Sequence, residues 1–155
     1  MSGGKSKRRA KKRRDKLRRG VPKVLRQRVK ENFPHQEVVV GTQNDGIKMS
    51  EVMEELVEPY REHAETKEAY RMLLTLAVVA WNMTLFPEKK RASMLDKLIV
   101  TLPEEVRADG KVIIEELMLR KERFFTEYRR MIIDFEVTDT GGGWHLSVMS
   151  TAKPV

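Results

Sequence analysis

The residues with the clearest chemical signal form a basic run near the N-terminus. Ten of the thirteen residues from 7 to 19 are Lys or Arg, and Asp15 is their only acid. Such a density of positive charge attracts polyanions and displaces counterions from phosphates. The predicted nucleic-acid-binding residues are therefore Lys7, Arg8, Arg9, Lys11, Lys12, Arg13, Arg14, Lys16, Arg18 and Arg19.

The composition of this segment favours RNA over DNA. Eight of the 15 basic residues in residues 1–30 are Arg, whose planar guanidinium suits phosphates and base edges. No aromatic residue precedes Phe33, so stacking on unpaired bases is not expected of this segment. In composition it resembles the arginine-rich tails that bind structured RNA in many ribosome-associated proteins. A nuclear import signal, a contact with an anionic membrane or an acidic protein, and a solubility tail are the alternatives.

Five glutamates between residues 51 and 62 could in principle ligate a metal or transfer protons. They centre opposite the apolar face that Val52, Leu56 and Tyr60 form on the helix expected there, so we expect them to point to solvent. A weaker alternative is that this acidic face docks a basic partner, or the protein's own basic segment. Without a Glu-x-x-His pair, the pattern does not indicate a di-metal site.

Lys121 is the least expected single residue, because it falls in the centre of an apolar helical stripe, one turn from Leu117 and Phe125. Three interpretations stay open. The lysine extends its amine to solvent along the apolar surface, it neutralises a buried acid, or it is a functional amine with a perturbed pKa. Arg120 and Arg123 flank it and make a basic patch conceivable.

The remaining candidates have structural explanations. His35, His63 and His145 share no motif and are expected in a connector or on the surface. The three glycines at 141–143 lack the helix and Lys-Ser/Thr of a phosphate loop and predict a hairpin turn. The chain has no Cys, which excludes thiolate zinc sites, iron–sulfur clusters and a Cys nucleophile. We predict no catalytic residue, no metal site and no cofactor.

The charge distribution divides the chain into a basic arm and an acidic body. Residues 1–30 hold 15 Lys/Arg and one acid, net +14, whereas residues 31–155 hold 16 Lys/Arg and 22 Asp/Glu, net −6. The arm, residues 1–32, has no hydrophobic period and is expected to be disordered. Residues 33–48 are predicted to be a connector, in which the run 38–40 could form a short strand. Residues 49–155 are predicted to be the globular domain.

Hydrophobic periodicity predicts about four helices in this domain. The first begins after an expected N-cap at Ser50, and Pro59 bends or shortens it. The second, about 66–86, is apolar nearly all round and is expected in the middle of the bundle. The third opens at Pro87. A capping box, Thr101 to Glu104, precedes a short turn that breaks at Asp109-Gly110, and the fourth helix spans about 111–129.

The period then changes from 3.6 to 2. Ile133, Phe135 and Val137 alternate with polar residues, and after the glycines Trp144, Leu146 and Val148 do the same, which predicts a C-terminal β-hairpin with one apolar face. Because a lone hairpin is marginal in water, we expect this face to pack on the helix at 111–129, around Leu117, Phe124 and Tyr128.

The fold class is therefore mainly α (α+β): about four helices in a small bundle with a C-terminal β-hairpin, preceded by a disordered basic N-terminal arm. We expect a non-enzymatic, nucleic-acid-associated protein that binds RNA or a ribonucleoprotein through its arm and a protein partner through its acidic body. The alternatives are a small enzyme with an unrecognised site in the body, or an adaptor that binds protein alone. The longest apolar stretch, residues 72–86, is too short for a membrane span, and no secretory signal is visible. The expected location is the cytoplasm, or the nucleus in a eukaryote.

Overall fold

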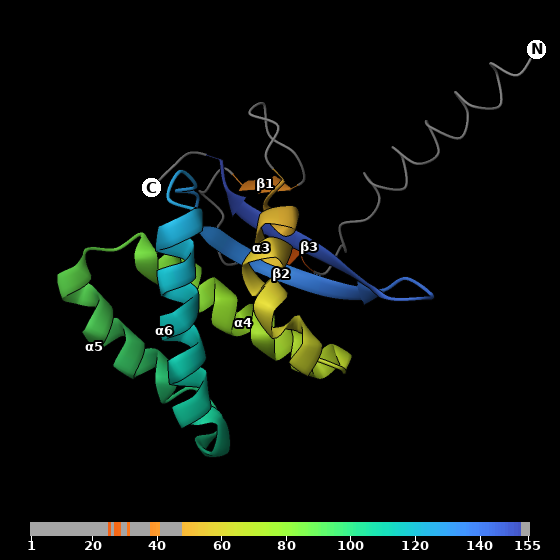
Figure 1. Cartoon of the computed structure of the whole chain (residues 1–155). Helices are drawn as coiled ribbons and strands as arrows, with labels where there is room; N and C mark the ends of the chain where they lie inside the picture. Colours follow the sequence, from red (N-terminus) through yellow and green to blue (C-terminus); the bar gives the residue numbers. More distant parts are fainter. Residues whose placement is uncertain (1–24, 26, 29–30, 32–37, 41–47, 153–155) are drawn as a thin grey trace, which may run out of the picture.

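The structure of the chain is a computed structural model that describes Leu25, Gln27, Arg28, Glu31 and residues 38–40 and 48–152. Its elements confirm the mainly helical fold with a C-terminal hairpin. In chain order they are strand β1 (Val38–Val40), helix α3 (Met49–Val57), the 3-10 helix η1 (Glu58–His63), α4 (Lys67–Thr84), α5 (Glu88–Ile99), the 3-10 helix η2 (Glu104–Val106), α6 (Arg107–Phe124), β2 (Ile132–Asp139) and β3 (Trp144–Thr151). Figure 1 shows α3 lying across the hairpin, and α5 and α6 at the side far from the hairpin turn.

Helix α4 is the central element of the core, as its sequence predicts. It contacts α3, α5, α6 and β2. Its buried residues lie on most sides of the helix and include Tyr70, Leu74, Ala77 and Trp81, none more than 1% exposed. The N-cap Thr66 accepts a hydrogen bond from the backbone N–H of Ala69, which satisfies one of the free donors of the first turn. Every other α-helix in residues 48–152 therefore packs around this one.

One helix boundary near the start of the domain differs from the sequence prediction, and another agrees with it. Ser50 lies inside α3 and is buried, and Lys48 occupies the N-cap position without a side-chain cap. Pro59 acts as predicted: the α-helix ends at Val57 and the chain continues as the 3-10 helix η1. The apolar period over residues 52–60 therefore runs through both helices.

The predicted capping box and the predicted break at Asp109-Gly110 are both wrong. The Thr101 hydroxyl donates to the carbonyl of Leu98 at the end of α5 and does not cap the next helix. Helix α6 runs without interruption through Gly110 and ends at Phe124. Gly110 is buried, and a Cβ there would lie 2.9 Å from Leu102 Cδ1. A larger residue there would require the Leu102 side chain to shift, so the glycine reflects close packing within the helix and not a turn.

The hairpin belongs to a three-stranded antiparallel sheet of order β1-β3-β2. Residues 38–40 do form a strand, and they pair with β3 from Met149 to Thr151. Between Ile132 and Asp134 the register of β2 shifts by a β-bulge, so Ile132 takes the core-facing position and Ile133 is the extra residue. Strict alternation had placed Ile133 on the core face.

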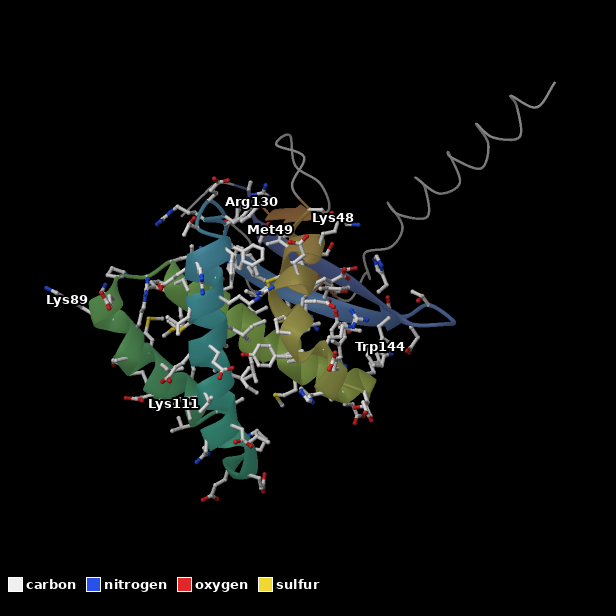
Figure 2. All side chains as sticks on the ribbon, in the orientation of Figure 1. Lys48, Met49, Lys89, Lys111, Arg130 and Trp144 are labelled. Atoms are coloured by element: carbon white, nitrogen blue, oxygen red, sulfur yellow. The ribbon has the colours of Figure 1, made fainter. Side chains whose placement is uncertain are left out.

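The hairpin packs on different helices from those predicted. Strand β2 contacts α4 and β3 contacts α3. Trp144 stacks on Tyr70 of α4 with ring centroids 5.3 Å apart, whereas Phe124, one of its predicted neighbours, is exposed. Figure 2 shows Trp144 at one end of the hairpin and Arg130 at the other.

One side chain of α4 fixes the start of β2. Asn82 donates from Nδ2 to the carbonyl of Ile132 (2.8 Å) and accepts from the Ile132 N–H at Oδ1 (2.9 Å). The neighbouring Trp81 donates from Nε1 to the carbonyl of Arg130 (2.7 Å). The amide of Asn82 thus satisfies the backbone of Ile132 in the way a neighbouring strand would, at the residue where β2 begins.

We predict that replacing Asn82 by Asp destabilises the protein by about 1–3 kcal/mol, because the carboxylate cannot donate to the Ile132 carbonyl and leaves that group unsatisfied. Urea unfolding monitored by Trp fluorescence measures the change. Thr75→Ala is the matched control on the same helix, since its exposed hydroxyl donates only to Arg71 within the helix. Equal midpoints for Asn82→Asp and the wild type would contradict the role given to this amide.

Candidate functional site

The ten predicted nucleic-acid-binding residues from Lys7 to Arg19, and His35 in the connector, lie outside the described residues. The last part of the predicted arm is described at four positions. Leu25, Gln27, Arg28 and Glu31 are helical, and Leu25 is completely buried. Leu25 and Arg28 therefore pack with the body, whereas Gln27 and Glu31 are exposed.

Arg28 holds this segment against the sheet. Its Nε donates to the Asp134 carboxylate, and its Nη2 donates to the carbonyl of Phe135 (3.0 Å) and lies 3.5 Å from the Glu136 carboxylate. The hydrogen bond to Asp134 raises the pKa of Arg28 above its usual range. The sequence places Asp134 and Glu136 on one face of a strand, in the pattern of a catalytic carboxylate pair. In the structure both carboxylates form ion pairs with Arg28.

Sequence reasoning missed this contact, but the sequence does carry a signal for the helical segment that holds Arg28. Apolar residues recur at positions 21, 24, 25 and 29, which is helical spacing inside a basic segment. The charge of the segment concealed the period. Arg28 lies about one helical turn after Leu25. Because Leu25 is buried, Arg28 lies close to the body, where it binds Asp134 of the sheet.

Three further arginines each bind the C-terminal end of a helix. Arg120 donates to the carbonyls of Glu55 and Leu56 at the end of α3. Arg91 donates to those of Thr84 and Phe86 after α4, and Arg107 to those of Val100 and Leu102 after α5. A guanidinium there satisfies free carbonyls and offsets the negative end of the helix dipole. These arginines stabilise the fold and are not available to a polyanion.

Arg123 differs from those three. Its side chain forms no ion pair or hydrogen bond with any residue in the described part of the chain, and its Cζ lies 5.3 Å from the ring centroid of Phe124. Phe124 is 59% exposed, and the Cζ of Arg120 lies 5.4 Å from the same centroid. An exposed aromatic ring thus lies beside two guanidiniums at the end of α6.

Lys121 is buried, at 4% exposure, and does not reach solvent freely. Its Nζ lies 4.9 Å from the centre of the Trp81 ring, a cation–π contact, and among the described residues it forms no ion pair. Burial lowers the pKa of Lys121, and the positive charge of Arg129 lowers it further. The sequence left open whether Lys121 neutralises a buried acid. In the structure its amine lies against the Trp81 ring instead.

A pocket of about 450 Å³ lies between η1, α4 and α6. Its walls are mostly apolar and include Met72, Leu76 and Val112. His63 and Asp109 also line it and are polar. Tyr60 also lines it and donates to Glu116. Burial and this hydrogen bond raise the pKa of Tyr60 to about 12, so the phenol stays protonated at neutral pH.

The glutamates of the first helix lie where the sequence places them. Glu51, Glu55, Glu58 and Glu62 are exposed and Glu54 is half-buried, on the side of α3 and η1 away from the core. None of the five forms an ion pair with a described residue. They make one side of the body acidic.

The other candidates occupy structural positions. Within the described ranges, no group of His, Asp and Glu residues is arranged to hold a metal ion. The three glycines form the hairpin turn, in which Gly141 has a φ of 79°. His145 lies half-buried on β3. None of the described helices has the length and apolar composition needed to cross a membrane.

Comparison of the chain with protein-family models, curated proteins and solved structures found no match. The chemistry of the residues is therefore the basis for a functional proposal.

We predict that Arg91→Lys lowers the free energy of unfolding by about 1–3 kcal/mol, because a lysine cannot bond both carbonyls after α4 and also reach Glu122. Arg123→Lys, on the same surface but without such bonds, should stay within about 0.5 kcal/mol of wild type. Paired thermal melts test both. Equal losses in the two variants would show that the helix ends do not depend on the guanidinium fork.

Lys121→Met should be as stable as the wild type or more stable at pH 7, because methionine fills the site of the stem and needs no charge beside Trp81. The lowered pKa means that the folded protein loses this proton before the unfolded chain does. Wild-type stability should therefore rise with pH between the lowered value and the ordinary 10.5, and the advantage of Lys121→Met should shrink over that range.

The control for the lysine is Lys121→Ala, which removes the buried stem and should be less stable than Lys121→Met. Urea titrations at several pH values measure both variants. A Lys121→Met protein that loses stability equally at every pH would instead indicate a required polar contact of the amine.

Proposed function

We propose that the protein is a non-enzymatic, nucleic-acid-associated protein that binds RNA, or a ribonucleoprotein, through its basic arm. The observation that carries the proposal is the charge of residues 7–19, where ten of thirteen residues are basic. The acidic helical body contacts a protein partner. The arm supplies electrostatic affinity, and the body sets where the bound nucleic acid lies.

The attachment of the arm supports this division. Leu25 is buried and Arg28 binds Asp134, Glu136 and the backbone of β2, so the chain that follows the basic run is fixed to the sheet. A polyanion bound by residues 7–19 is therefore held close to the body. Arg28 itself is occupied by this contact and adds nothing to phosphate binding.

The acidic side of the body supports the second part. Glu51, Glu55, Glu58 and Glu62 repel phosphates, and none of them forms an ion pair with a described residue. A nucleic acid therefore approaches from another side, and the acidic side suits a basic protein surface. Contacts of this kind govern the rate of association and the choice of partner more than raw affinity.

We predict that the wild type binds a single-stranded RNA with a steep salt dependence. About eight phosphate contacts correspond to a slope near −6 in a plot of log K against log salt concentration. A full-length variant with the ten basic residues of 7–19 changed to Gln should lose most of this affinity and slope. Fluorescence anisotropy with a labelled 12-nucleotide RNA, titrated at several salt concentrations, measures both.

The control is a second full-length variant, in which the arm is unchanged and Glu51, Glu55 and Glu58 are changed to Gln. Both variants retain Leu25 and Arg28, so the attachment of the arm is the same in each. The control variant should bind RNA at least as tightly as the wild type. An arm variant that binds with wild-type affinity and slope would contradict the proposal. A DNA strand of the same sequence is titrated in parallel, and tighter binding to it would contradict the preference for RNA.

A further inference from the structure

We propose that Phe124 and Arg123, at the C-terminal end of α6, form a binding site for an unpaired nucleobase and its phosphate. The inference rests on the proposed function and adds to it the class of nucleic acid that the body takes: a single-stranded segment, whose bases are free to stack. The arm alone has no means to recognise such a segment, since no aromatic residue precedes Phe33.

The first observation is the exposure of the ring. Phe124 is 59% exposed, and every other aromatic side chain in the described part of the chain is buried or half-buried. Its neighbour Phe125 is 7% exposed and packs against Trp81 and Tyr128. The fold therefore uses one of two adjacent phenylalanines for its core and leaves the other on the surface.

The second observation is that only one of the two guanidiniums beside the ring is held by hydrogen bonds. Arg120 is fixed by its bonds to the carbonyls of Glu55 and Leu56, so it keeps a positive charge at the ring. Arg123 has no described bond, and its flexible side chain is free to move off the ring. A base can then stack on Phe124 while the guanidinium of Arg123 binds the adjoining phosphate.

The charge of the surroundings favours a nucleic acid over a protein as the occupant. Of the basic residues at 120–130, Arg123 and Arg129 are exposed and Arg120 is fixed beside the ring, whereas Lys121 and Arg130 are buried. The Glu122 carboxylate is paired with Arg91, and the lowered pKa of Lys121 reflects the positive charge of Arg129 in addition to burial. Phosphates complement this charge. Stacking also accepts any base, so the site needs no sequence-specific contacts.

The experiment compares two probes of equal length and charge on the full-length protein. One is a labelled 12-nucleotide oligoadenosine RNA, and the other is a 12-unit ribose-phosphate strand without bases. The wild type should bind the RNA more tightly than the abasic strand. Phe124→Ala should weaken binding to the RNA by roughly 5- to 150-fold, the range for one stacked base, and leave binding to the abasic strand unchanged.

Three matched variants separate stacking from charge and from general apolar contact. Phe124→Trp should retain the affinity for RNA, because indole also stacks. Leu119→Ala, which changes a side chain 67% exposed on the same helix, should bind both probes like the wild type. Arg123→Gln should reduce the slope of log K against log salt by about 0.7 for both probes, as expected for one lost phosphate contact on a single strand.

The outcomes distinguish this site from the proposed function. If the wild type binds both probes equally, or if Phe124→Ala binds the RNA like the wild type, the stacking site is overturned while the arm's electrostatic binding stands. In that case, contact with a protein partner would be the next hypothesis for the exposed ring of Phe124. If the wild type binds neither probe, the proposed function itself fails. Thermal melts of Phe124→Ala check that the exposed substitution leaves the fold intact.

Discussion

The position of the strands depends on one interaction, the pair of hydrogen bonds between the Asn82 amide and the backbone of Ile132. Helix α4 is buried on most sides, so every element that packs on it must do so without leaving polar groups unsatisfied. Asn82 is half-buried, on the narrow polar strip of the helix, and Trp81 bonds Arg130 just before the strand. Together the two side chains determine where β2 begins, and the bulge that follows lets Ile132 face the core while Asp134 faces Arg28.

The same structure shows how arginines divide between fold and function. Arg91, Arg107 and Arg120 each bind carbonyls at the end of a helix, and Arg28 binds the sheet. A count of basic residues therefore overstates the charge that the body can offer to a polyanion. Each of these guanidiniums is held by two or more acceptors, so moving it would leave carbonyls of a helix end or of β2 without a hydrogen-bond donor. Arg123, without such bonds, is the exception on which the base-stacking proposal depends.

Periodicity in the sequence was enough to predict four helices and a hairpin, because each has a continuous apolar face of the right spacing. It could not predict features that depend on close contacts between distant residues. Gly110 signals a break by local propensity, yet Leu102 packs where its side chain would be. The bulge at Ile133 breaks an alternation that looks regular. The pairing of Arg28 with Asp134 joins residues 106 positions apart, which no local pattern encodes. Lys121 was recognised as unusual, but the aromatic partner required the fold.

A single stacked base on Phe124 would be too weak to matter alone, and its value depends on the attachment of the arm. Stacking contributes about 1–3 kcal/mol per base, whereas even millimolar affinity requires about 4 kcal/mol. When residues 7–19 bind phosphates of the same strand, the base reaches Phe124 as part of an already bound molecule, so its effective concentration is high. The high effective concentration depends on Leu25 and Arg28. Leu25 is buried and Arg28 binds Asp134 of β2, so the chain that follows the basic run stays attached to the body. In this proposal, electrostatic affinity from the arm and stacking by the body are coupled through the attachment of Leu25 and Arg28.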